Sequence, residues 1–531
     1  LGWSMAHRWA VVALCGLTVV SIVPLFMFVG KNFLPVDDQS QFEVTVRTPE
    51  GSTLAATSTV LERMAAELRR LPGVTDTLTT VGGGQQELVN SATIYVKLTP
   101  IEEREASQNE LMARAREVVA RYPQDLRTAV QQVAAISGGG FRNSDIQYVV
   151  SGPDLKQLAT YADKLVAKMK SIPDVVDVDS SLISGKPEVR VEIDRRRAAD
   201  LGVRVGDIAQ ALNIFVAGQE VSTFNVGTDQ YEVRLRALGN FRRSPADLGR
   251  MIVNSSKGGW VTLDNVVRLE EGTGPSSIDR LNRQRQVTIT SNVKPGGSQS
   301  AVIAQMDQFV RELKVDPSYS TGLAGRSKEL GKAGYYFLLA IVLSFIFMYM
   351  VLAAQFESLI HPVTILLTLP LSIPFGILSL LVAGQTVNIF SGLGLLLLFG
   401  IVKKNAILQI DHTNGLRAKG MERHDAVLQA NRDRLRPILM TTLALVAGMI
   451  PLVLSTGPGS GTNRSIGVLV VGGQTLCLLL TLLAVPVFYS LFEDLGELPL
   501  WRRVGDRYRT AAAGARRLLP NRKQAGEVSG D

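Results

Sequence analysis

The chain has 531 residues and a formal net charge of +8. A single hydrophobic core seldom extends beyond about 250–300 residues, so several domains are expected. The charge does not indicate a nucleic-acid partner, because eight basic residues are gathered in a tail between Arg502 and Lys523. Such a tail favours a cytoplasmic location beside a membrane.

Apolar residues are concentrated in blocks long enough to cross a bilayer. Ala10–Val29 exceeds the roughly 7–15 apolar residues of a signal peptide and is interpreted as an anchor. Five later blocks each cover a hydrocarbon core of about 30 Å at about 1.5 Å per residue. The six predicted spans are Ala10–Val29, 334–354, 362–383, 388–411, 437–456 and 466–492.

Basic residues fix the predicted orientation. With His7 and Arg8 in the cytoplasm, the long segment after the first span lies outside and the tail returns to the cytoplasm. The loop between the fourth and fifth spans also becomes cytoplasmic, and it is rich in lysine and arginine, as the positive-inside rule requires. These residues are Arg417, Lys419, Arg423, Arg432, Arg434 and Arg436.

The polar segment after the first span has the pattern of a soluble α+β insertion. Gln41–Arg47 alternates as a strand and Thr53–Arg70 has helical periodicity. Ile146–Ser151 and Leu155–Ser171 repeat this order about a hundred residues on, which indicates an internal duplication.

The chain then leaves the second repeat and returns to it. A strand at Glu188–Asp194, helical structure over Arg195–Leu212 with a break at Gly202, and a hairpin arm at 213–238 are expected first. The last strand, Gln286–Val293, and the helix Ser300–Lys314 complete a split α/β sandwich. The predicted fold class is a polytopic α-helical membrane protein with a large α+β insertion.

Two adjacent lysines, Lys403 and Lys404, lie inside the fourth span. A lysine within a membrane helix costs about 2.5–3.5 kcal/mol on insertion scales and usually faces a bundle interior with a partner. Neighbouring residues point about 100° apart, so one of the two is expected to face inward. Lys404 is preferred because it lies seven residues inside Asp411, which weakens a location at the headgroups. The alternative is that both side chains extend to the lipid headgroups.

The fifth span brings a second cation and a hydroxyl. Arg434 and Thr441 are seven residues apart and share a helical face, so they could line one path with Lys404. The alternative is that Arg434 is a topology anchor and that Thr441 bonds its own backbone.

Neither Asp411, at a helix end, nor Glu357, in a loop, offers a counter-charge within a span. The partner is therefore expected from another polypeptide or from a missing part of this one, and the start at Leu1 also indicates a fragment or a processed chain.

Enzymatic sites are not predicted. Cys15 and Cys477 lie in apolar blocks and are interpreted as packing residues. With four histidines and no Cys-x-x-Cys or His-Glu-x-x-His, a metal site has no support, and no cofactor is expected.

These motifs resemble the resistance-nodulation-division (RND) transporters, specifically the hydrophobe/amphiphile drug exporters of Gram-negative inner membranes. The resemblance runs from the first span to Phe488. The strings that carry it are Phe33-Leu34-Pro35, Gly400–Leu408, Arg434–Thr442, Ser455–Gly461 and Val485–Phe488.

The resemblance implies the second half of a twelve-span, proton-driven pump with a periplasmic porter domain. Implied partners are an N-terminal half, two further copies in a homotrimer, a periplasmic adaptor protein, an outer-membrane channel, membrane lipid and small amphiphilic substrates. The implied domains are 1–37, the first span; 38–142, porter subdomain one; 143–184 and 281–330, porter subdomain two; 185–280, a docking subdomain with the arm 213–238 reaching a neighbouring subunit; 331–494, five spans; and 495–531, a basic cytoplasmic tail.

The resemblance also implies roles for single residues. The family relay pairs a lysine with two aspartates of the other half, helped by an arginine and a threonine, which here match Lys404, Arg434 and Thr441, with Asn405 following the lysine. Family drug pockets are rich in phenylalanine, but the region from Leu78 to Gly84 reads Leu-Thr-Thr-Val-Gly-Gly-Gly. The residues placed at pocket positions are Tyr95, Leu78, Thr45, Gln131 and Ser181.

Two other functions are consistent with the topology. A metal-ion exporter of the same superfamily would need methionines clustered in the porter clefts as soft ligands, whereas the insertion has scattered ones. These are Met64, Met112, Met169, Met251 and Met306. A non-transporting scaffold or translocation accessory protein would account for the spans but not for Lys404 with Arg434 and Thr441.

Overall fold

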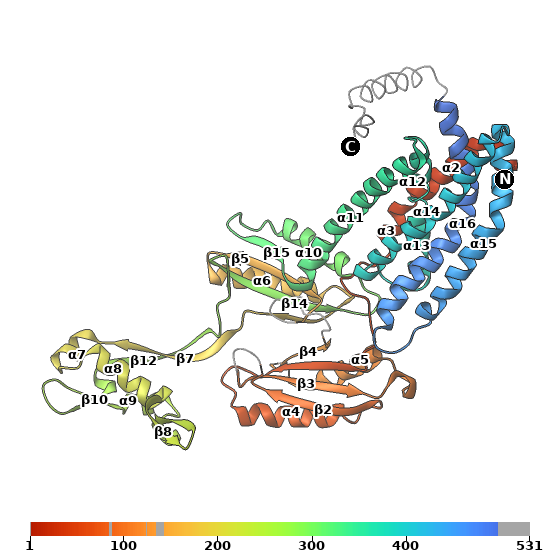
Figure 1. The fold of residues 1–531 in the computed structure, drawn as a ribbon. Coiled ribbons are helices and arrows are strands. Elements are labelled where there is room, and N and C mark those ends of the chain that lie inside the picture. The colour runs from red at the N-terminus through yellow and green to blue at the C-terminus, as the bar shows by residue number, and fades with distance from the viewer. Residues whose placement is uncertain (1, 84–87, 124, 134–142, 497–531) are drawn as a thin grey trace, which may run out of the picture.

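The computed structural model describes residues 2–83, 88–123, 125–133 and 143–496. A bundle of long helices stands at one end, two sheets with their helices lie beside it, and a smaller unit projects away on two long strands (Figure 1). The predicted basic tail from 497 onward and Gly84 of the glycine-rich segment lie outside the described residues.

The first sheet unit consists of β1 (Gln41–Arg47), α4 (Leu54–Leu68), β2 (Val74–Val81), β3 (Ser91–Leu98), α5 (Gln108–Val119) and β4 (Arg127–Gln132). Its antiparallel strands lie in the order β2-β3-β1-β4. The alternation of β1 directs Phe42, Val44 and Val46 into a core with α4 and α5, as the period of two requires. The other face of the sheet is free of helices from this unit.

The second sheet unit repeats this plan. It consists of β5 (Ile146–Gly152), α6 (Leu155–Lys170), β6 (Val175–Ser180), β14 (Gln284–Val293), α10 (Gln299–Leu313) and β15 (Ser320–Leu323), with the short strand β13 (Arg280–Leu281) at its edge. β5 pairs with β14 and β15, and β6 pairs with β14, just as β1 pairs with β3 and β4, and β2 with β3. The predicted duplication is therefore confirmed by strand pairing.

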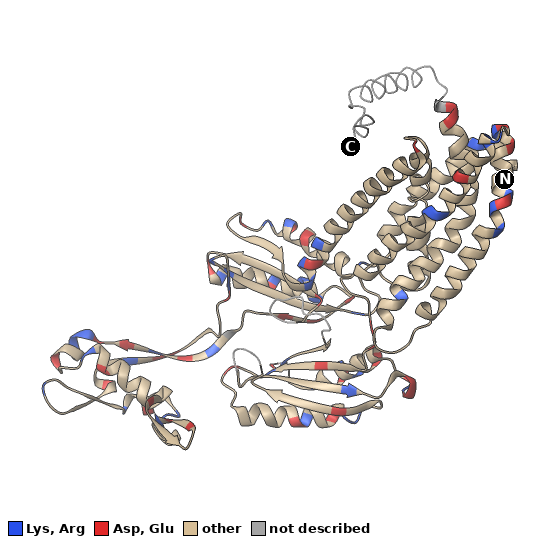
Figure 2. Ribbon diagram, in the orientation of Figure 1, with Lys and Arg blue, Asp and Glu red and all other residues tan. Residues whose placement is uncertain are grey.

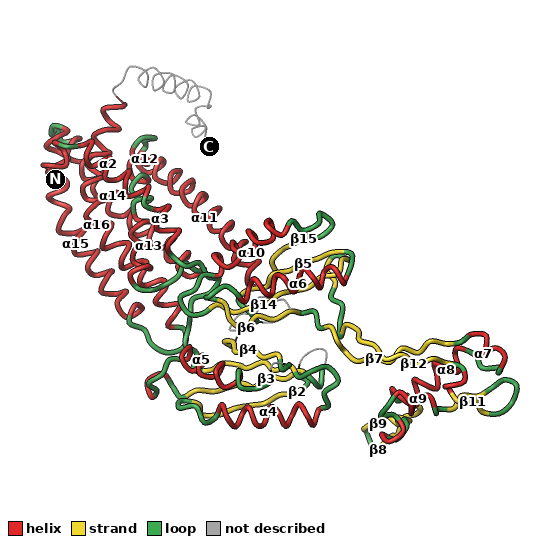
Figure 3. The backbone as a smooth tube through the Cα atoms, turned by 180° about the vertical axis from the view of Figure 1, so that it is seen from behind, coloured by secondary structure: helices red, strands yellow, loops and turns green. Residues whose placement is uncertain are grey.

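The distal unit is inserted between β6 and β14. β7 (Ser184–Ile193) and β12 (Val267–Pro275) form a two-stranded stalk, visible from behind in Figure 3. At its end lie α7 (Arg195–Asp200), α8 (Val205–Leu212), β8 (Gln219–Val226), β9 (Asp229–Leu235), α9 (Pro245–Gly249), β10 (Ile252–Asn254) and β11 (Trp260–Thr262). The expected break occurs at Gly202, which has a φ of +69°. The hairpin arm is shorter than predicted, because Asn213–Ala217 continues α8 as a π-helical turn.

The helical bundle consists of α1 (Gly2–Ala6), α2 (Arg8–Val20), α3 (Ile22–Phe28), α11 (Gly325–Phe356), α12 (His361–Leu366), α13 (Ser372–Val382), α14 (Ile389–Ala418), α15 (Arg423–Val453) and α16 (Ser460–Gly496). Within the described residues, five segments are long and apolar enough to cross a membrane: Arg8–Phe28, α11, α14, α15 and α16 up to Asp494. α16 packs against α2, α12, α13, α14 and α15 and is the central helix of the bundle.

The predicted span 362–383 is not one helix. α12 ends at Leu366 and α13 begins at Ser372, so five residues interrupt the helical hydrogen bonding. Pro370 lacks an N–H and disfavours helical geometry at the residue before it. The hydroxyls of Thr368 and Ser372 instead donate to the carbonyls of Ile365 and Leu369, at 2.6 and 2.7 Å. A hydropathy average does not detect this break, because every residue around it is apolar or small.

Charged residues are sparse along the middle of the bundle and gather at its end near the chain's N-terminus, in the sheet units and in the distal unit (Figure 2). At that end Asp494 binds Arg8 at 2.9 Å and Arg423 at 2.6 Å. The carboxylate thus joins the last turn of α16 to α2 and α15. These ion pairs link the helix ends on the side of the bundle for which the charge pattern predicts a cytoplasmic location.

Candidate functional site

Lys404 lies deep within α14. Fifteen residues separate it from Ile389 at the helix start, which is about 22 Å along the axis. The packed face of α14 carries Phe399, Val402 and Ala406, whereas the side chain of Lys404 is exposed and that of Lys403 is half-buried. Lys404 therefore faces away from the helices of this chain. Among the described residues, no carboxylate lies within 4.0 Å of its Nζ.

Arg434 and Thr441 lie on α15, which packs against α14. Arg434 is half-buried, and its Nε is enclosed without a hydrogen-bond partner among the described residues. Thr441 is exposed, and its hydroxyl donates to the carbonyl of Ile438 at 3.2 Å. The threonine thus makes the backbone contact that was the alternative expectation. The Nε of the arginine has no partner in the part of the chain that the structure describes.

Asn405, which the resemblance placed beside the lysine, belongs to a set of buried polar side chains within α14, α15 and α16 whose other members the sequence analysis did not single out. Gln409 is buried with Asn405 on α14, and the Nε2 of Gln474 on α16 donates to Thr442 Oγ1 on α15 at 3.4 Å. The Oε1 atoms of Gln409 and Gln474 and the Oδ1 of Asn431 lack a partner among the described residues. Buried polar atoms are normally satisfied, so such a group indicates a place for water or for residues of another chain. The sequence signal that could have revealed these residues is the presence of amide side chains in otherwise apolar spans.

Four of the five predicted pocket residues share the helix-free face of the first sheet unit. Thr45 lies on β1, Leu78 on β2, Tyr95 on β3 and Gln131 on β4, and Leu78 pairs with Tyr95 across the sheet. The Tyr95 hydroxyl donates to Gln41, and Gln131 Nε2 donates to Glu43 Oε1 at 2.5 Å. This face therefore presents polar groups, with Leu78 as a large exposed apolar side chain.

Ser181 is separate from that face. It follows β6 of the second sheet unit and is buried. Its Oγ accepts the backbone N–H of Thr288 at 3.0 Å, and its own N–H donates to the Thr288 carbonyl at 2.8 Å. Its side chain is thus engaged in extending the sheet of its own unit.

Gln131 also lines a cavity of about 120 Å³ between the two sheet units and the segment that follows α3. Ligand sites for drug-sized molecules usually have about 300–1,000 Å³, so this cavity suits water or small ions. Its wall includes Asp145, which accepts the N–H of Val293 at 3.1 Å and lies 3.4 Å from Arg326 of α11. Burial raises the pKa of the Asp145 carboxyl, while Arg326 opposes that rise.

The methionines of the insertion do not form a soft metal site. Met64 and Met112 belong to the core of the first sheet unit, Met169 and Met306 to that of the second, and Met251 to that of the distal unit. Within the described residues, no group of three or more His, Cys, Asp or Glu side chains is arranged to hold a metal.

Two solved structures of a heavy-metal efflux pump have a similar fold. One crystal form of such a pump matches with a TM-score of 0.81 and 24% sequence identity over 93% of this chain and 52% of the other. A second crystal form matches with a TM-score of 0.78 and 24% identity over 92% and 51%. The chain therefore spans about half the length of these structures, and the likeness at this identity concerns the fold.

The fold and the polar groups inside its helices define a multi-pass membrane protein with a soluble α+β portion. Residues 1–493 match the AcrB/AcrD/AcrF family. The chain belongs to this family, which is the RND family of transporters and not a family of enzymes.

Proposed function

We propose that this chain is the C-terminal half of a proton-driven inner-membrane pump that exports small amphiphilic compounds. The observation that carries this proposal is Lys404, an exposed cation on α14 that no described carboxylate of this chain accompanies. A lysine inside a membrane span is costly without a partner, so a second set of helices carrying acidic groups accounts for it. α12 and α13 together would then serve as a sixth span.

The proposed coupling is electrostatic. When carboxylates of the other half are ionised, they attract Lys404, and when they bind protons the attraction is lost. Arg434, with its free Nε, and Asn405 lie on the two helices that would sense this change, and Thr441 could exchange its backbone contact for one to the incoming groups. Protonation would thus select one of two helix arrangements.

The soluble part fits the role of a porter. The two sheet units are repeats of one plan. The polar face with Thr45, Tyr95 and Gln131 is the side of the first sheet that its own helices leave uncovered. We propose that substrates pass along this face, with Leu78 as an apolar contact. Ser181 would act there only by holding the second sheet unit in shape.

The partners follow from the same assignment. The β8–β9 arm is exposed from Glu220 to Leu235 and carries Phe224 and Tyr231, which suits insertion into a neighbouring copy in a homotrimer. A periplasmic adaptor protein and an outer-membrane channel would complete the export path, in a bacterial inner membrane, with the proton gradient as energy source.

Export of metal ions is the second candidate, because two of the similar solved structures are of a heavy-metal efflux pump. The positions of the methionines favour amphiphiles, since each of them packs in a closed core. Met112 alone also borders the cavity between the sheet units, and one thioether is a poor soft-metal site.

The test compares Lys404→Ala with the matched control Lys403→Ala in the complete pump, with both halves present. In cells without other drug pumps, ethidium efflux should fall at least a hundredfold in Lys404→Ala at unchanged protein amount, and Lys403→Ala should keep most of it. Equal efflux in both variants would contradict the relay. Protection from Cu(I) or Zn(II) without any ethidium efflux in the parent pump would instead favour metal export.

A further inference from the structure

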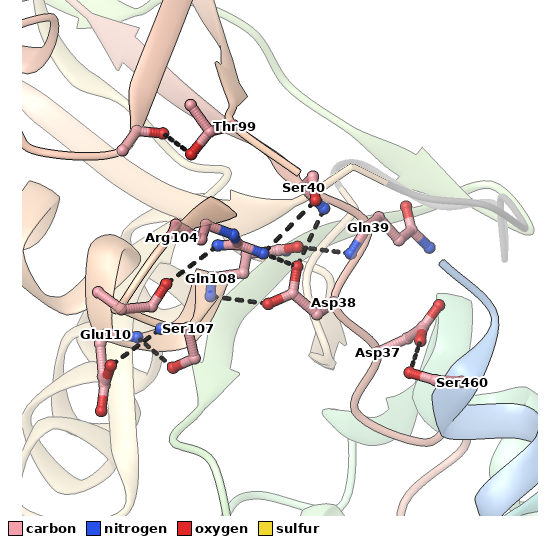
Figure 4. A network of polar contacts seen from close by, with 12 residues as sticks. Asp37, Asp38, Gln39, Ser40, Thr99, Arg104, Ser107, Gln108, Glu110 and Ser460 are labelled. Carbon is pink, nitrogen blue, oxygen red and sulfur yellow. Dashed lines mark hydrogen bonds and ion pairs between the residues drawn. The ribbon is translucent and has the colours of Figure 1, made fainter. Parts of the chain in front are cut away.

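The segment between the first span and β1 carries two adjacent carboxylates that bind in opposite directions (Figure 4). Asp37 turns toward the membrane helices. Its Oδ2 accepts the N–H of Gly459 at 2.8 Å, and its Oδ1 accepts the N–H of Gly461 at 3.0 Å and lies 3.4 Å from the Ser460 hydroxyl. Asp37 therefore occupies the N-terminus of α16, where free N–H groups and the helix dipole favour a negative charge.

Asp38, the next residue, turns toward the first sheet unit. Its Oδ2 accepts the N–H of Gln108, the first residue of α5, at 2.9 Å. Its Oδ1 accepts the N–H of Ser40 at 3.1 Å and pairs with Arg104, whose side chain is only 2% exposed. The side-chain oxygen of Gln108 in turn accepts the N–H of Gln39 at 2.7 Å. The second carboxylate thus holds the N-terminus of α5.

Consecutive Cα atoms are about 3.8 Å apart, so the two helix ends are held by one rigid peptide unit. The close fit at α16 supports this. A Cβ added at Gly461 would lie 2.4 Å from the carbonyl oxygen of Val36 and 3.3 Å from the Cα of Asp37. Any side chain at Gly461 would therefore push the segment away from α16.

Both helices lead to functional parts of the molecule. α16 is the central helix of the bundle and packs along α14, which carries Lys404. α5 is covered by the first sheet unit on one side and reaches the second unit through Arg116, whose Nε lies 3.0 Å from Asp177 Oδ2. A shift of α16 along its axis would thus reach both sheet units through the two carboxylates.

We infer that Asp37 and Asp38 are positioning residues that transmit movement of α16 to α5, and so couple proton passage to substrate export. This inference rests on the proposed function, because it names the mechanical step of that transport cycle. Among the described residues, neither carboxylate has a hydrogen bond to the proposed relay or pocket residues, although Asp37 borders the cavity that Gln131 also lines. Loss of the Asp37 contact should therefore uncouple proton movement from export. Protons should still enter, but less substrate should be exported per proton.

The test uses the complete pump in proteoliposomes with an imposed proton gradient, a pH-sensitive dye and ethidium as the exported compound. The parent pump should show proton influx that rises with ethidium. In Asp37→Ala, ethidium export should fall at least tenfold while proton influx persists, so that the number of ethidium molecules moved per proton falls. A pump that is only destabilised would lose both fluxes in proportion.

The matched control is Asp154→Ala. Asp154 also caps a helix, since its Oδ1 accepts the N–H of Gln157 at 2.9 Å, but that contact lies within the second sheet unit. Its ratio of ethidium to protons should equal that of the parent. An unchanged ratio in Asp37→Ala, or an equal fall in Asp154→Ala, would overturn the inference.

Two further variants test the same coupling if the Asp37→Ala pump does not assemble. Asp37→Asn keeps the shape and one acceptor oxygen, and Gly461→Ala displaces the segment without removing a charge. Both should lower the ratio at least threefold, whereas Gly415→Ala, at a helical glycine with no atom within 4 Å of the added Cβ, should not. A parent pump without ethidium-dependent proton influx would contradict the proposed function itself, whatever the Asp37 variants show.

Discussion

The sheet units and the helical bundle differ in how far this chain completes its own contacts. In the sheet units, Arg116 and Arg127 meet the carboxylates of Asp177 and Asp179, and side chains such as Ile94 are fully enclosed. In the middle of the bundle, Lys404 meets no described carboxylate, and Leu479 remains 72% exposed. The cores of the two sheet units are thus closed by residues of this chain, whereas the bundle presents surfaces that suit lipid and a second set of helices.

The sharpest difference in stability should come from core truncation. Ile94→Ala removes a fully buried side chain of the first sheet unit and should lower the free energy of unfolding by about 2–5 kcal/mol. The matched variant Leu479→Ala, on the exposed face of α16, should change it by less than about 0.5 kcal/mol. Urea unfolding of the purified chain, followed by protease sensitivity, measures both. Similar losses in the two variants would remove the contrast.

The buried amides of the bundle provide the next test. Gln409→Leu replaces a buried side chain whose Oε1 lacks a partner among the described residues. If these amides line a hydrated path, the complete pump should lose about three- to tenfold in ethidium efflux, equal to about 0.7–1.4 kcal/mol, while its thermal stability stays the same or rises. Unchanged efflux would assign Gln409 to packing. Leu408→Gln on the same helix is the reverse control and should lower stability.

The smallest effect concerns Tyr148 in the sheet units. Its hydroxyl donates to Asp307 Oδ1 at 2.9 Å, and burial raises the pKa of the phenol to about 12. The unfolded chain releases this proton near pH ~10, so the free energy of unfolding should fall as pH rises from about 10 to about 12.

Tyr148→Phe should lack this part of the pH dependence and cost about 0.5–1.5 kcal/mol at pH 8 through the lost hydrogen bond. Thermal unfolding at several pH values measures it, and the exposed Tyr231 gives the control Tyr231→Phe. The same alkaline slope in Tyr148→Phe and the parent would show that other groups cause it.

Local patterns predicted much of this fold. The alternation in Gln41–Arg47 and the helical period after Thr53 were sufficient for β1 and α4, and the recurrence of the pattern at Ile146 identified the duplication. The break between α12 and α13 was missed because apolarity alone does not report where a helix is interrupted.

Sequence reasoning could propose a site residue only where that residue carries an unusual cost. A lysine in a span is conspicuous in any sequence, so Lys404 was proposed, and helix geometry could say only that it and Lys403 point in different directions. Its actual direction depends on which face of α14 packs against α16. The contact of Asp37 with Gly459 and Gly461 was beyond sequence reasoning, since more than four hundred residues separate the partners.

The stalk formed by β7 and β12 would amplify any tilt of the second sheet unit, because it is long. Its strands are paired from Val267 and Ile193 to Pro275 and Ser184, and at about 3.3 Å per residue they reach roughly 30 Å from the second sheet unit. A rotation of that sheet by about 10° would therefore carry the far end of the stalk through roughly 5 Å, about the spacing of neighbouring strands. Small tilts of the second sheet unit would become large displacements at the β8–β9 arm.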